Sequence, residues 1–324
     1  MGLSLCPKIH TGAGPRAMRY TLPFYNLPPA PCTLVTVPLL RSIRVTLEMI
    51  KWEHSIFALP FALTAAMLAA HGWPPLSKLL WIVVCMVSAR SAAMAFNRWA
   101  DADLDAANPR TRQRAIPAGL LTRNFTAAFT IVMAAVFILA AAQLNHLALL
   151  LSPIILVILF FYSYTKRFTR WSHLFLGLAL GLAPTGAWIA IRGSLDPRIL
   201  VLTTAVLFWV AGFDVLYACQ DESHDRTAGL LSIPATLGTA NAFLIARTMH
   251  LIMLALLVTL VVLFHLGPIA FAGIAAVAAL LLWEHLIVSP KDLTRLNAAF
   301  FTMNGVIAVI FFVFIAADLL FRHT

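Results

Sequence analysis

Charged residues are scarce in this chain of 324 residues: they make up 11% of it, against about 25% in an average soluble domain. Its four cysteines have no close pairing and no CxxC spacing, so the sequence indicates neither a disulfide framework nor a metal knuckle. No collagen repeat, sustained heptad pattern or highly charged, weakly hydrophobic composition is present. These absences exclude an ordinary soluble enzyme, a fibrous protein and an intrinsically disordered one.

Apolar residues are abundant instead, at 61% of the chain, and the mean hydropathy is +0.89. One globular core cannot bury that much apolar surface, so lipid must solvate much of it. A membrane helix needs about 20 apolar residues. The sequence therefore predicts an all-α integral membrane protein, a bundle of nine transmembrane helices near residues 55–72, 79–97, 124–143, 147–164, 172–191, 199–217, 243–265, 268–288 and 297–318.

The start of the chain differs from the rest. Residues 1–38 contain seven prolines and no sustained apolar run, so we expect a disordered extension ahead of a membrane domain over 39–324. Residues 39–55 then alternate apolar and charged side chains with helical period, which predicts an amphipathic helix at the membrane interface. A plain extension of the first span is the alternative.

Lysine and arginine predict the orientation of the bundle. The N-terminal region and the loops after every second span hold 18 of the 23 basic residues. The opposite side holds only Lys78, Arg192, Arg198 and Arg322, and Arg90 lies inside the second span. By the positive-inside rule the N-terminus and the long loops face the cytoplasm, which favours a multi-pass protein of a bacterial-type inner membrane with its C-terminus outside.

Seven of the 13 acidic residues fall in two short windows, each at the cytoplasmic end of an even-numbered span. In the first window, Asn97, Asp101 and Asp105 are spaced i, i+4, i+8, which sets an amide and two carboxylates on one helical stripe. In the second, Asp214, Tyr217, Asp221 and Asp225 are spaced i, i+3, i+7, i+11 and again share a face.

Stacked carboxylates repel one another unless a cation lies between them. Oxygen ligands suit Mg²⁺, which prefers to share the phosphate oxygens of a substrate. Basic residues flank both windows, so the pattern predicts a site for a phosphorylated lipid. A simpler interpretation competes with it, in which the acids and arginines at span ends are only interfacial anchors. The histidines are scattered along the chain, so a zinc or haem site built from them is disfavoured.

The two windows resemble the aspartate motifs of the UbiA superfamily of intramembrane prenyltransferases. The first reads Asn97-x3-Asp101-x3-Asp105 and continues as Asn108-Pro-Arg-Thr-x2-Arg-x2-Pro. The second reads Asp214-x2-Tyr-x2-Gln-Asp-x3-Asp and continues as Ser-Ile-Pro. Residues 53–60 are similar to the start of the bacterial 4-hydroxybenzoate polyprenyltransferase branch, and the resemblance covers about residues 39–318.

The resemblance implies a helical bundle with a central, laterally open cavity, in which Mg²⁺ bridges the two windows and a polyprenyl diphosphate. The prenyl group passes to an aromatic carboxylic acid, most simply 4-hydroxybenzoate in ubiquinone-type quinone biosynthesis. The bilayer is a partner, and no nucleic acid is expected. The implied metal ligands are Asn97, Asp101, Asp105, Asp221 and Asp225, and the four aspartates are the implied catalytic residues.

The resemblance also implies the substrate contacts. Arg110, Arg114 and Lys166 hold the diphosphate, with Tyr162 one turn before Lys166. Arg90, two turns deeper than Asn97, pairs with the acceptor carboxylate. The implied substrate-binding set is Arg90, Asn97, Arg110, Arg114, Tyr162, Lys166, Asp214, Tyr217 and Gln220. One position departs from the family, which often has aspartate directly after the asparagine, where this chain has Arg98.

Other functions stay open at this stage. A dihydroxynaphthoate acceptor, as in menaquinone biosynthesis, fits the same motifs. A transporter predicts charges near the bilayer midplane and inverted repeats, whereas these acids cluster at one end of the bundle. A pseudoenzyme or lipid-binding scaffold is disfavoured because Asp101, Asp105, Asp221 and Asp225 are all present.

Overall fold

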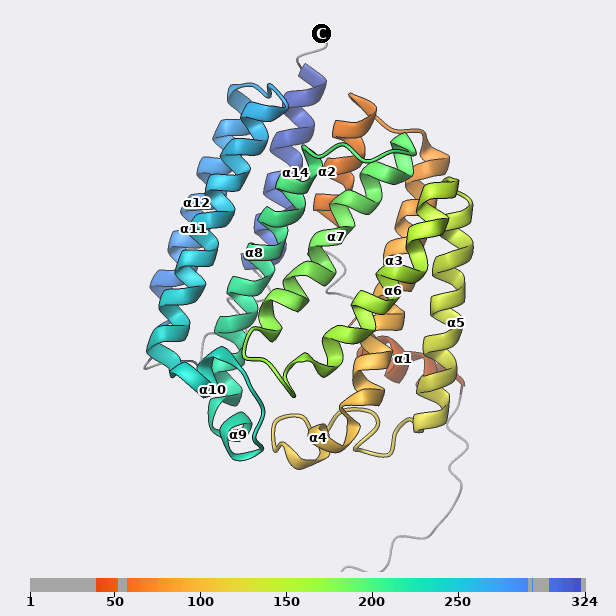
Figure 1. Ribbon diagram of the computed structural model, residues 1–324, viewed down its shortest axis with the longest axis vertical. Helices are drawn as coiled ribbons and strands as arrows, with labels where there is room; N and C mark the ends of the chain where they lie inside the picture. The colour runs from red at the N-terminus through yellow and green to blue at the C-terminus, as the bar shows by residue number, and fades with distance from the viewer. Residues whose placement is uncertain (1–38, 52–56, 291–292, 294–302, 322–324) are drawn as a thin grey trace, which may run out of the picture. The chain divides into compact units, whose positions relative to one another are not determined.

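The structure is a computed structural model, and it describes residues 39–51, 57–290, 293 and 303–321. Eight long helices form the bundle (Figure 1). They are α3 (Leu76–Ala100), α5 (Arg123–Ala142), α6 (His146–Thr165), α7 (Ser172–Arg192), α8 (Ile199–Ala218), α11 (Thr239–Leu263), α12 (Pro268–Ile287) and α14 (Asn304–Phe321). The shorter helices are α1 (Leu39–Ile50), α2 (Leu59–Ala70), α4 (Ala102–Ala107), η2 (Cys219–Asp221), α9 (Glu222–Thr227) and α10 (Ile233–Leu237).

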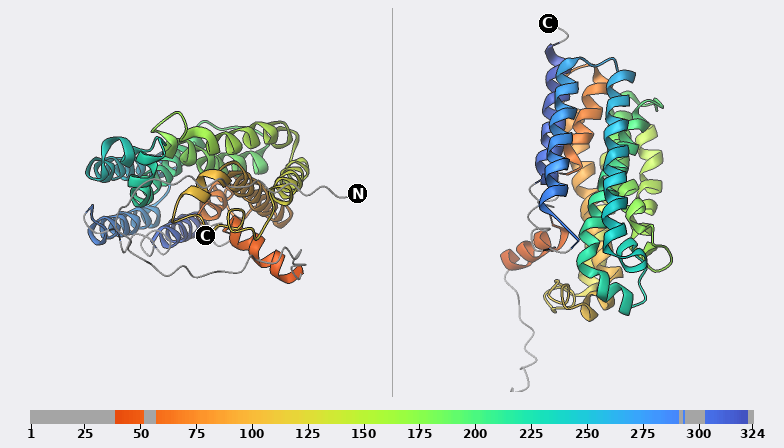
Figure 2. Two further views of the ribbon diagram at one scale, coloured as in Figure 1. Left: turned by 90° about the horizontal axis from the view of Figure 1, so that it is seen from below. Right: turned by 90° about the vertical axis from the view of Figure 1, so that its left-hand side faces the viewer.

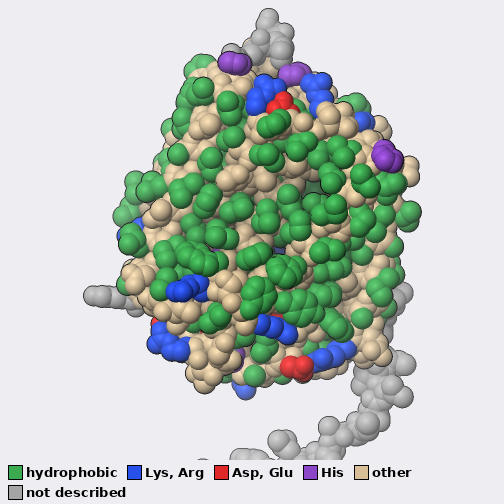
Figure 3. All heavy atoms as spheres, in the orientation of Figure 1, with side chains coloured by type: hydrophobic (Ala, Val, Ile, Leu, Met, Phe, Trp, Pro, Cys, Tyr) green, Lys and Arg blue, Asp and Glu red, His purple; other side chains and the backbone are tan. Residues whose placement is uncertain are grey.

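The long helices confirm an all-α membrane protein. All eight are long and apolar enough to cross a bilayer by length and composition. On the face shown in Figure 3, hydrophobic side chains cover the middle, while charged side chains gather toward the two ends. The predicted count of nine spans is therefore approximate: within the described ranges eight helices meet the length criterion, and α2 occupies the place of the first predicted span.

Helix α2 has only 12 residues, nine of them buried. It packs against α7, α8 and α14. The Phe61 ring lies 5.0 Å from the Trp209 ring of α8 and 5.2 Å from the Phe311 ring of α14. Hydropathy alone predicts a membrane span that faces lipid here. In the structure the neighbouring helices enclose α2 instead, because its small alanine side chains let them approach closely.

Helix α1 is separate from the first predicted span. It ends at Ile50, where Lys51 takes a left-handed conformation with φ of 51°, and it lies across the direction of the long helices (Figure 2). Ile43 and Leu47 are exposed on it, as expected for an amphipathic helix at an interface. Residues 1–38, for which the sequence predicts a disordered extension, lie outside the described residues, and so do residues 52–56.

Small residues bring α7 and α8 together. A side chain at Gly177 would place its Cβ 2.3 Å from the Leu207 carbonyl oxygen, and one at Gly181 would lie 2.7 Å from that of Thr203. The two glycines are four residues apart and so share one face of α7, the spacing that permits close packing of membrane helices. This contact fixes α8, which carries the second acidic window.

Asp318 stabilises the start of α12. This carboxylate on α14 is fully buried and accepts hydrogen bonds from the backbone N–H groups of Gly267 (2.7 Å) and Ala270 (3.3 Å). It therefore acts as an N-terminal cap supplied by another helix. A negative charge at this place also interacts favourably with the positive end of the helix dipole.

Replacing Asp318 with alanine is expected to destabilise the protein by about 1–3 kcal/mol, because two buried donors lose their acceptor. Thermal unfolding in detergent, followed by tryptophan fluorescence, measures this loss, and Asp318→Asn should lose less because one acceptor oxygen remains. Asp103→Ala is the control, since Asp103 is exposed and pairs with Arg123 at the surface. Equal melting temperatures for Asp318→Ala and the control would contradict the capping role.

Candidate active site

The first acidic window spans the end of α3 and the short helix α4. Asp101 ends α3, and Asp105 lies one turn on in α4, where its N–H donates to the Asp101 carbonyl at 2.8 Å. Both carboxylates are buried, with 6% of each residue exposed. Asn97 donates its side-chain N–H to Asp101 Oδ2 at 2.9 Å. The helical stripe predicted from the spacing is therefore present.

The second window is interrupted. Helix α8 ends at Ala218, the chain tightens into η2, and α9 begins at Glu222. Asp221 closes the 3₁₀ turn, and Asp225 is buried in α9, where it accepts a hydrogen bond of 3.0 Å from the Ser232 hydroxyl. The same hydroxyl caps α10. Because of this break, the window does not form the single straight face that its spacing predicts.

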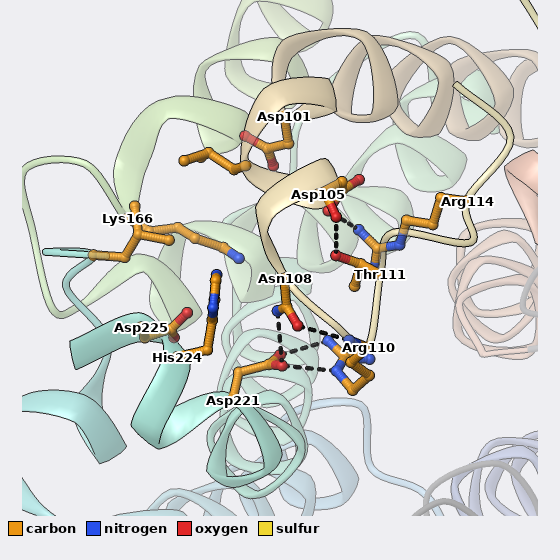
Figure 4. Close-up of a pocket in the computed structure, with 12 residues that line it drawn as sticks. Asp101, Asp105, Asn108, Arg110, Thr111, Arg114, Lys166, Asp221, His224 and Asp225 are labelled. Atoms are coloured by element: carbon orange, nitrogen blue, oxygen red, sulfur yellow. Dashed lines mark hydrogen bonds and ion pairs between the residues drawn. The ribbon is translucent and has the colours of Figure 1, made fainter. Parts of the chain in front are cut away.

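The two windows face one pocket at one end of the bundle, beside α4 and α9 (Figures 1 and 4). The carboxylates lie on different sides of it, and Lys166 and His224 point into the space between them (Figure 4). The lining residues are Asp101, Leu104, Asp105, Asn108, Arg110, Thr111, Arg114, Lys166, Asp221, His224, Asp225 and Leu230.

Arginines pair with three of the four aspartates. Arg110 donates to Asp221 through Nε (2.7 Å) and Nη2 (2.5 Å), which is a bidentate pair. Arg114 binds Asp105 at 2.6 Å, and Arg167 binds Asp101 at 3.2 Å. Burial lowers the pKa of the Arg110 guanidinium, but its bonds to Asp221 outweigh burial and raise that pKa. The pocket is thus an array of opposite charges rather than a cluster of like ones.

Asn108 links the two windows. Its side-chain N–H group donates to Asp221 Oδ1 at 3.2 Å, and its side-chain oxygen accepts from the Arg110 N–H at 2.9 Å. Thr111 fixes the same loop by donating to the Asp105 carbonyl at 3.1 Å. The motif contains both residues, but their roles appear only once the loop is folded against η2.

Six predicted site residues do not line the pocket. Asn97 and Tyr217 contact it indirectly, through Asp101 and through a 3.3 Å hydrogen bond with Arg110. Gln220 donates to the Tyr217 carbonyl at 3.4 Å. The others are Arg90, which donates to the Lys51 carbonyl at 3.5 Å, Tyr162 on α6, and Asp214 on α8.

Asp214 is held by a histidine that the sequence did not single out. His173 Nδ1 lies 2.7 Å from Asp214 Oδ2, while its Nε2 accepts a hydrogen bond from the Ile233 N–H at 3.4 Å. Because Nε2 accepts, Nδ1 carries the proton and donates it to Asp214. This buried chain joins α7, α8 and α10, so Asp214 helps to position the second window.

The chemistry of the donor set fits Mg²⁺. Four carboxylates line one pocket, and Asp105 Oδ2 is buried with no hydrogen bond from the residues that the structure describes, while its other oxygen binds Arg114. Among the described residues, no three His, Cys, Asp or Glu side chains are grouped closely enough to hold a metal by themselves. Mg²⁺ does not require such a cage, because it is bound through one or two carboxylates, water and substrate phosphates.

Comparisons with known proteins identify the family of the chain. Residues 58–306 match the UbiA prenyltransferase family. The 4-hydroxybenzoate octaprenyltransferase of Cupriavidus necator is 32% identical over 247 residues, covering 76% of this chain and 86% of that one. The enzyme of the same name from Vibrio atlanticus is 29% identical over 244 residues, covering 75% of this chain and 86% of that one.

Solved structures share the fold. A UbiA homolog from Aeropyrum pernix superposes with a TM-score of 0.74 at 34% identity, covering 84% of this chain and 98% of that one. A UbiA homolog from Archaeoglobus fulgidus, solved with DMAPP and Mg²⁺, has a TM-score of 0.61 at 19% identity, covering 85% and 98%.

Proposed function

The chain belongs to the UbiA prenyltransferase family, and on that premise we propose that it transfers a polyprenyl group from polyprenyl diphosphate to an aromatic acid, 4-hydroxybenzoate first among them, in the synthesis of a ubiquinone-type quinone. The observation that carries the proposal is the pocket that Asp101, Asp105, Asp221 and Asp225 share with basic side chains. The relatives named 4-hydroxybenzoate octaprenyltransferase support the choice of acceptor.

The pocket residues divide the work of binding the diphosphate. Asn97, Asp101, Asp105, Asp221 and Asp225 would hold Mg²⁺; when bound, the metal neutralises charge on the leaving diphosphate. Arg110, Arg114 and Lys166 supply fixed positive charge to the same group. In a site screened from water, such charges stabilise the developing anion most strongly.

The reaction then breaks one bond and forms another. The C1–O bond of the prenyl diphosphate breaks, and its electron pair leaves with the diphosphate. A ring carbon beside the acceptor hydroxyl, activated by that hydroxyl, forms a bond to C1, and the ring proton passes to the released diphosphate. The apolar bundle keeps water from the allylic cation. We assign the acceptor carboxylate to Arg90 and Asn97 on α3.

The proposed orientation places this end of the bundle in the cytoplasm of a bacterial-type cell. Arg110, Arg112, Arg114, Lys166 and Arg167 all lie in its loops or at its helix ends, as the positive-inside rule requires. The soluble acceptor then enters from the cytoplasm, while the prenyl chain stays among the apolar helices.

A panel assay tests the proposal directly. Purified protein in lipid nanodiscs is incubated with geranyl or longer prenyl diphosphates, an aromatic acid, and either Mg²⁺ or EDTA, and products are identified by mass spectrometry. We expect prenylated hydroxybenzoate with Mg²⁺ and none with EDTA. Product from a dihydroxynaphthoate alone would move the assignment to the menaquinone-type acceptor, and no prenylated ring from any acid would refute the function.

A further inference from the structure

The loop that joins α6 to α7, residues 166–171, has an inner side bonded to the pocket. The Lys166 carbonyl accepts a hydrogen bond of 2.8 Å from the Leu231 N–H, in the chain that follows α9. The Arg167 guanidinium donates to Asp101 at 3.2 Å, at the end of α3. This short loop is therefore bonded to the segments that carry both acidic windows.

The outer side of the loop is aromatic and basic. Phe161, Phe168 and Trp171 have exposed fractions of 46%, 54% and 43%. The Phe161 and Phe168 rings lie 5.8 Å apart, so the loop continues the apolar surface near the end of α6. Arg170 is exposed beside them, and among the described residues it makes no hydrogen bond or ion pair.

The length of the loop places these side chains at the membrane surface. Both α6 and α7 are long and apolar enough to span a bilayer, and the loop lies at the end of the bundle where α4 and α9 are (Figure 1). A loop of this length that leaves the bilayer and returns reaches about 10 Å at most, against a headgroup layer of about 5–8 Å on each side. Exposed phenylalanine and tryptophan at that depth favour the bilayer interface over water.

The charge of the loop selects the kind of lipid. Lys166, Arg167 and Arg170 are basic, and residues 166–171 contain no acid. Lys166 points into the pocket (Figure 4), and Arg167 is bonded to Asp101, which leaves Arg170 to face the membrane. An arginine at the membrane surface attracts anionic phospholipids, and its planar fork matches the oxygens of a phosphate.

We propose that the outer side of residues 166–171 binds anionic phospholipid headgroups, and that this contact holds the inner side of the loop against both acidic windows. Arg170 supplies the charge, while Phe168 and Trp171 enter the interface beside the acyl chains. The inference does not depend on the reaction proposed above, because it requires only a bundle embedded in a membrane. Its consequence is that lipid composition controls how firmly the pocket is ordered.

Native mass spectrometry of the full chain in detergent, titrated with phosphatidylglycerol or phosphatidylcholine, measures the lipid preference. We expect wild type to bind phosphatidylglycerol more tightly. Arg170→Gln should reduce that preference about fivefold, the factor that corresponds to about 1 kcal/mol for one basic residue near an anionic surface. Phe168→Ser should weaken the binding of both lipids and leave the preference unchanged. The matched control is Arg112→Gln, which removes an exposed arginine of the α4–α5 loop and should bind like wild type.

Hydrogen exchange in nanodiscs tests the coupling to the pocket. The Leu231 N–H, which is bonded to the Lys166 carbonyl, should exchange more slowly with phosphatidylglycerol present than in phosphatidylcholine alone, and Arg170→Gln should reduce this difference. Equal affinity of wild type for the two lipids, or an equal loss in Arg112→Gln, would overturn the lipid site. Unchanged exchange at Leu231 would overturn the coupling. A failure of prenyl transfer would refute the proposed function without altering any of these results.

Discussion

Replacing Asp221 with asparagine is expected to lower the rate of prenyl transfer by about 1000-fold or more. The amide keeps the size of the side chain and can still accept a hydrogen bond from Arg110, but it loses the negative charge that we propose holds Mg²⁺ and that pairs with Arg110. A rate loss of that size corresponds to about 4 kcal/mol, which is within the range expected for disabling a metal that neutralises a leaving group. Asp101→Asn should act in the same direction.

Initial rates over a Mg²⁺ titration measure this effect, and melting temperature and elution volume show whether the variant is folded. Asp103→Asn is the control, because Asp103 lies in the first window beside Asp101 but is exposed and pairs with Arg123. It should retain nearly full activity. A rate for Asp221→Asn within a few-fold of wild type, at the same Mg²⁺ midpoint, would refute the metal role of the second window.

Replacing Arg110 with methionine should lower kcat/KM for prenyl diphosphate by about 100-fold, while KM for the acceptor changes little. Two effects combine in this variant. In the proposed complex the diphosphate loses a cation, at about 1.5–3 kcal/mol for hydrogen bonds to a charged group, and Asp221 loses its bidentate partner. The neighbouring Arg112→Met, which removes an exposed side chain, should behave like wild type.

A double-mutant cycle separates the two effects. If Arg110 and Asp221 act as one unit, Arg110→Met combined with Asp221→Asn should be hardly slower than Asp221→Asn alone. Fully additive losses would mean that the two residues act independently and that their ion pair has no role in transfer. Steady-state kinetics with both substrates varied provides the numbers.

The geometry of the first acidic window could be predicted from the sequence. Asn97, Asp101 and Asp105 repeat every four residues, and a helix converts that spacing into one stripe, as observed. The same argument is incomplete for the second window, because the 3₁₀ turn at Cys219–Asp221 separates Asp221 and Asp225 from the α-helix that carries Asp214. Local spacing cannot reveal such a turn.

Ion pairs and hydrogen bonds between residues far apart in the chain could not be predicted from the sequence. Arg167 reaches Asp101 across 66 residues, and Asn108 reaches Asp221 across 113. The basic residues were predicted to bind diphosphate, whereas the structure pairs three arginines with aspartates. Only the packing of α3, α6 and α8 decides which arginine meets which carboxylate. The assigned roles of these residues remain predictions, which the variants above test. The lateral opening of the cavity is a separate prediction.

The short helix α2 has a consequence for how the protein is made. Twelve residues of helix span about 18 Å, well below the 30 Å of a bilayer core, and the structure buries nine of them against other helices. The first of its main partners, α7, begins 102 residues after α2 ends. Helix α2 is therefore synthesised well before the helices that bury it. We expect it to reach its final position in the bilayer late in biogenesis, after α7, α8 and α14 have been inserted.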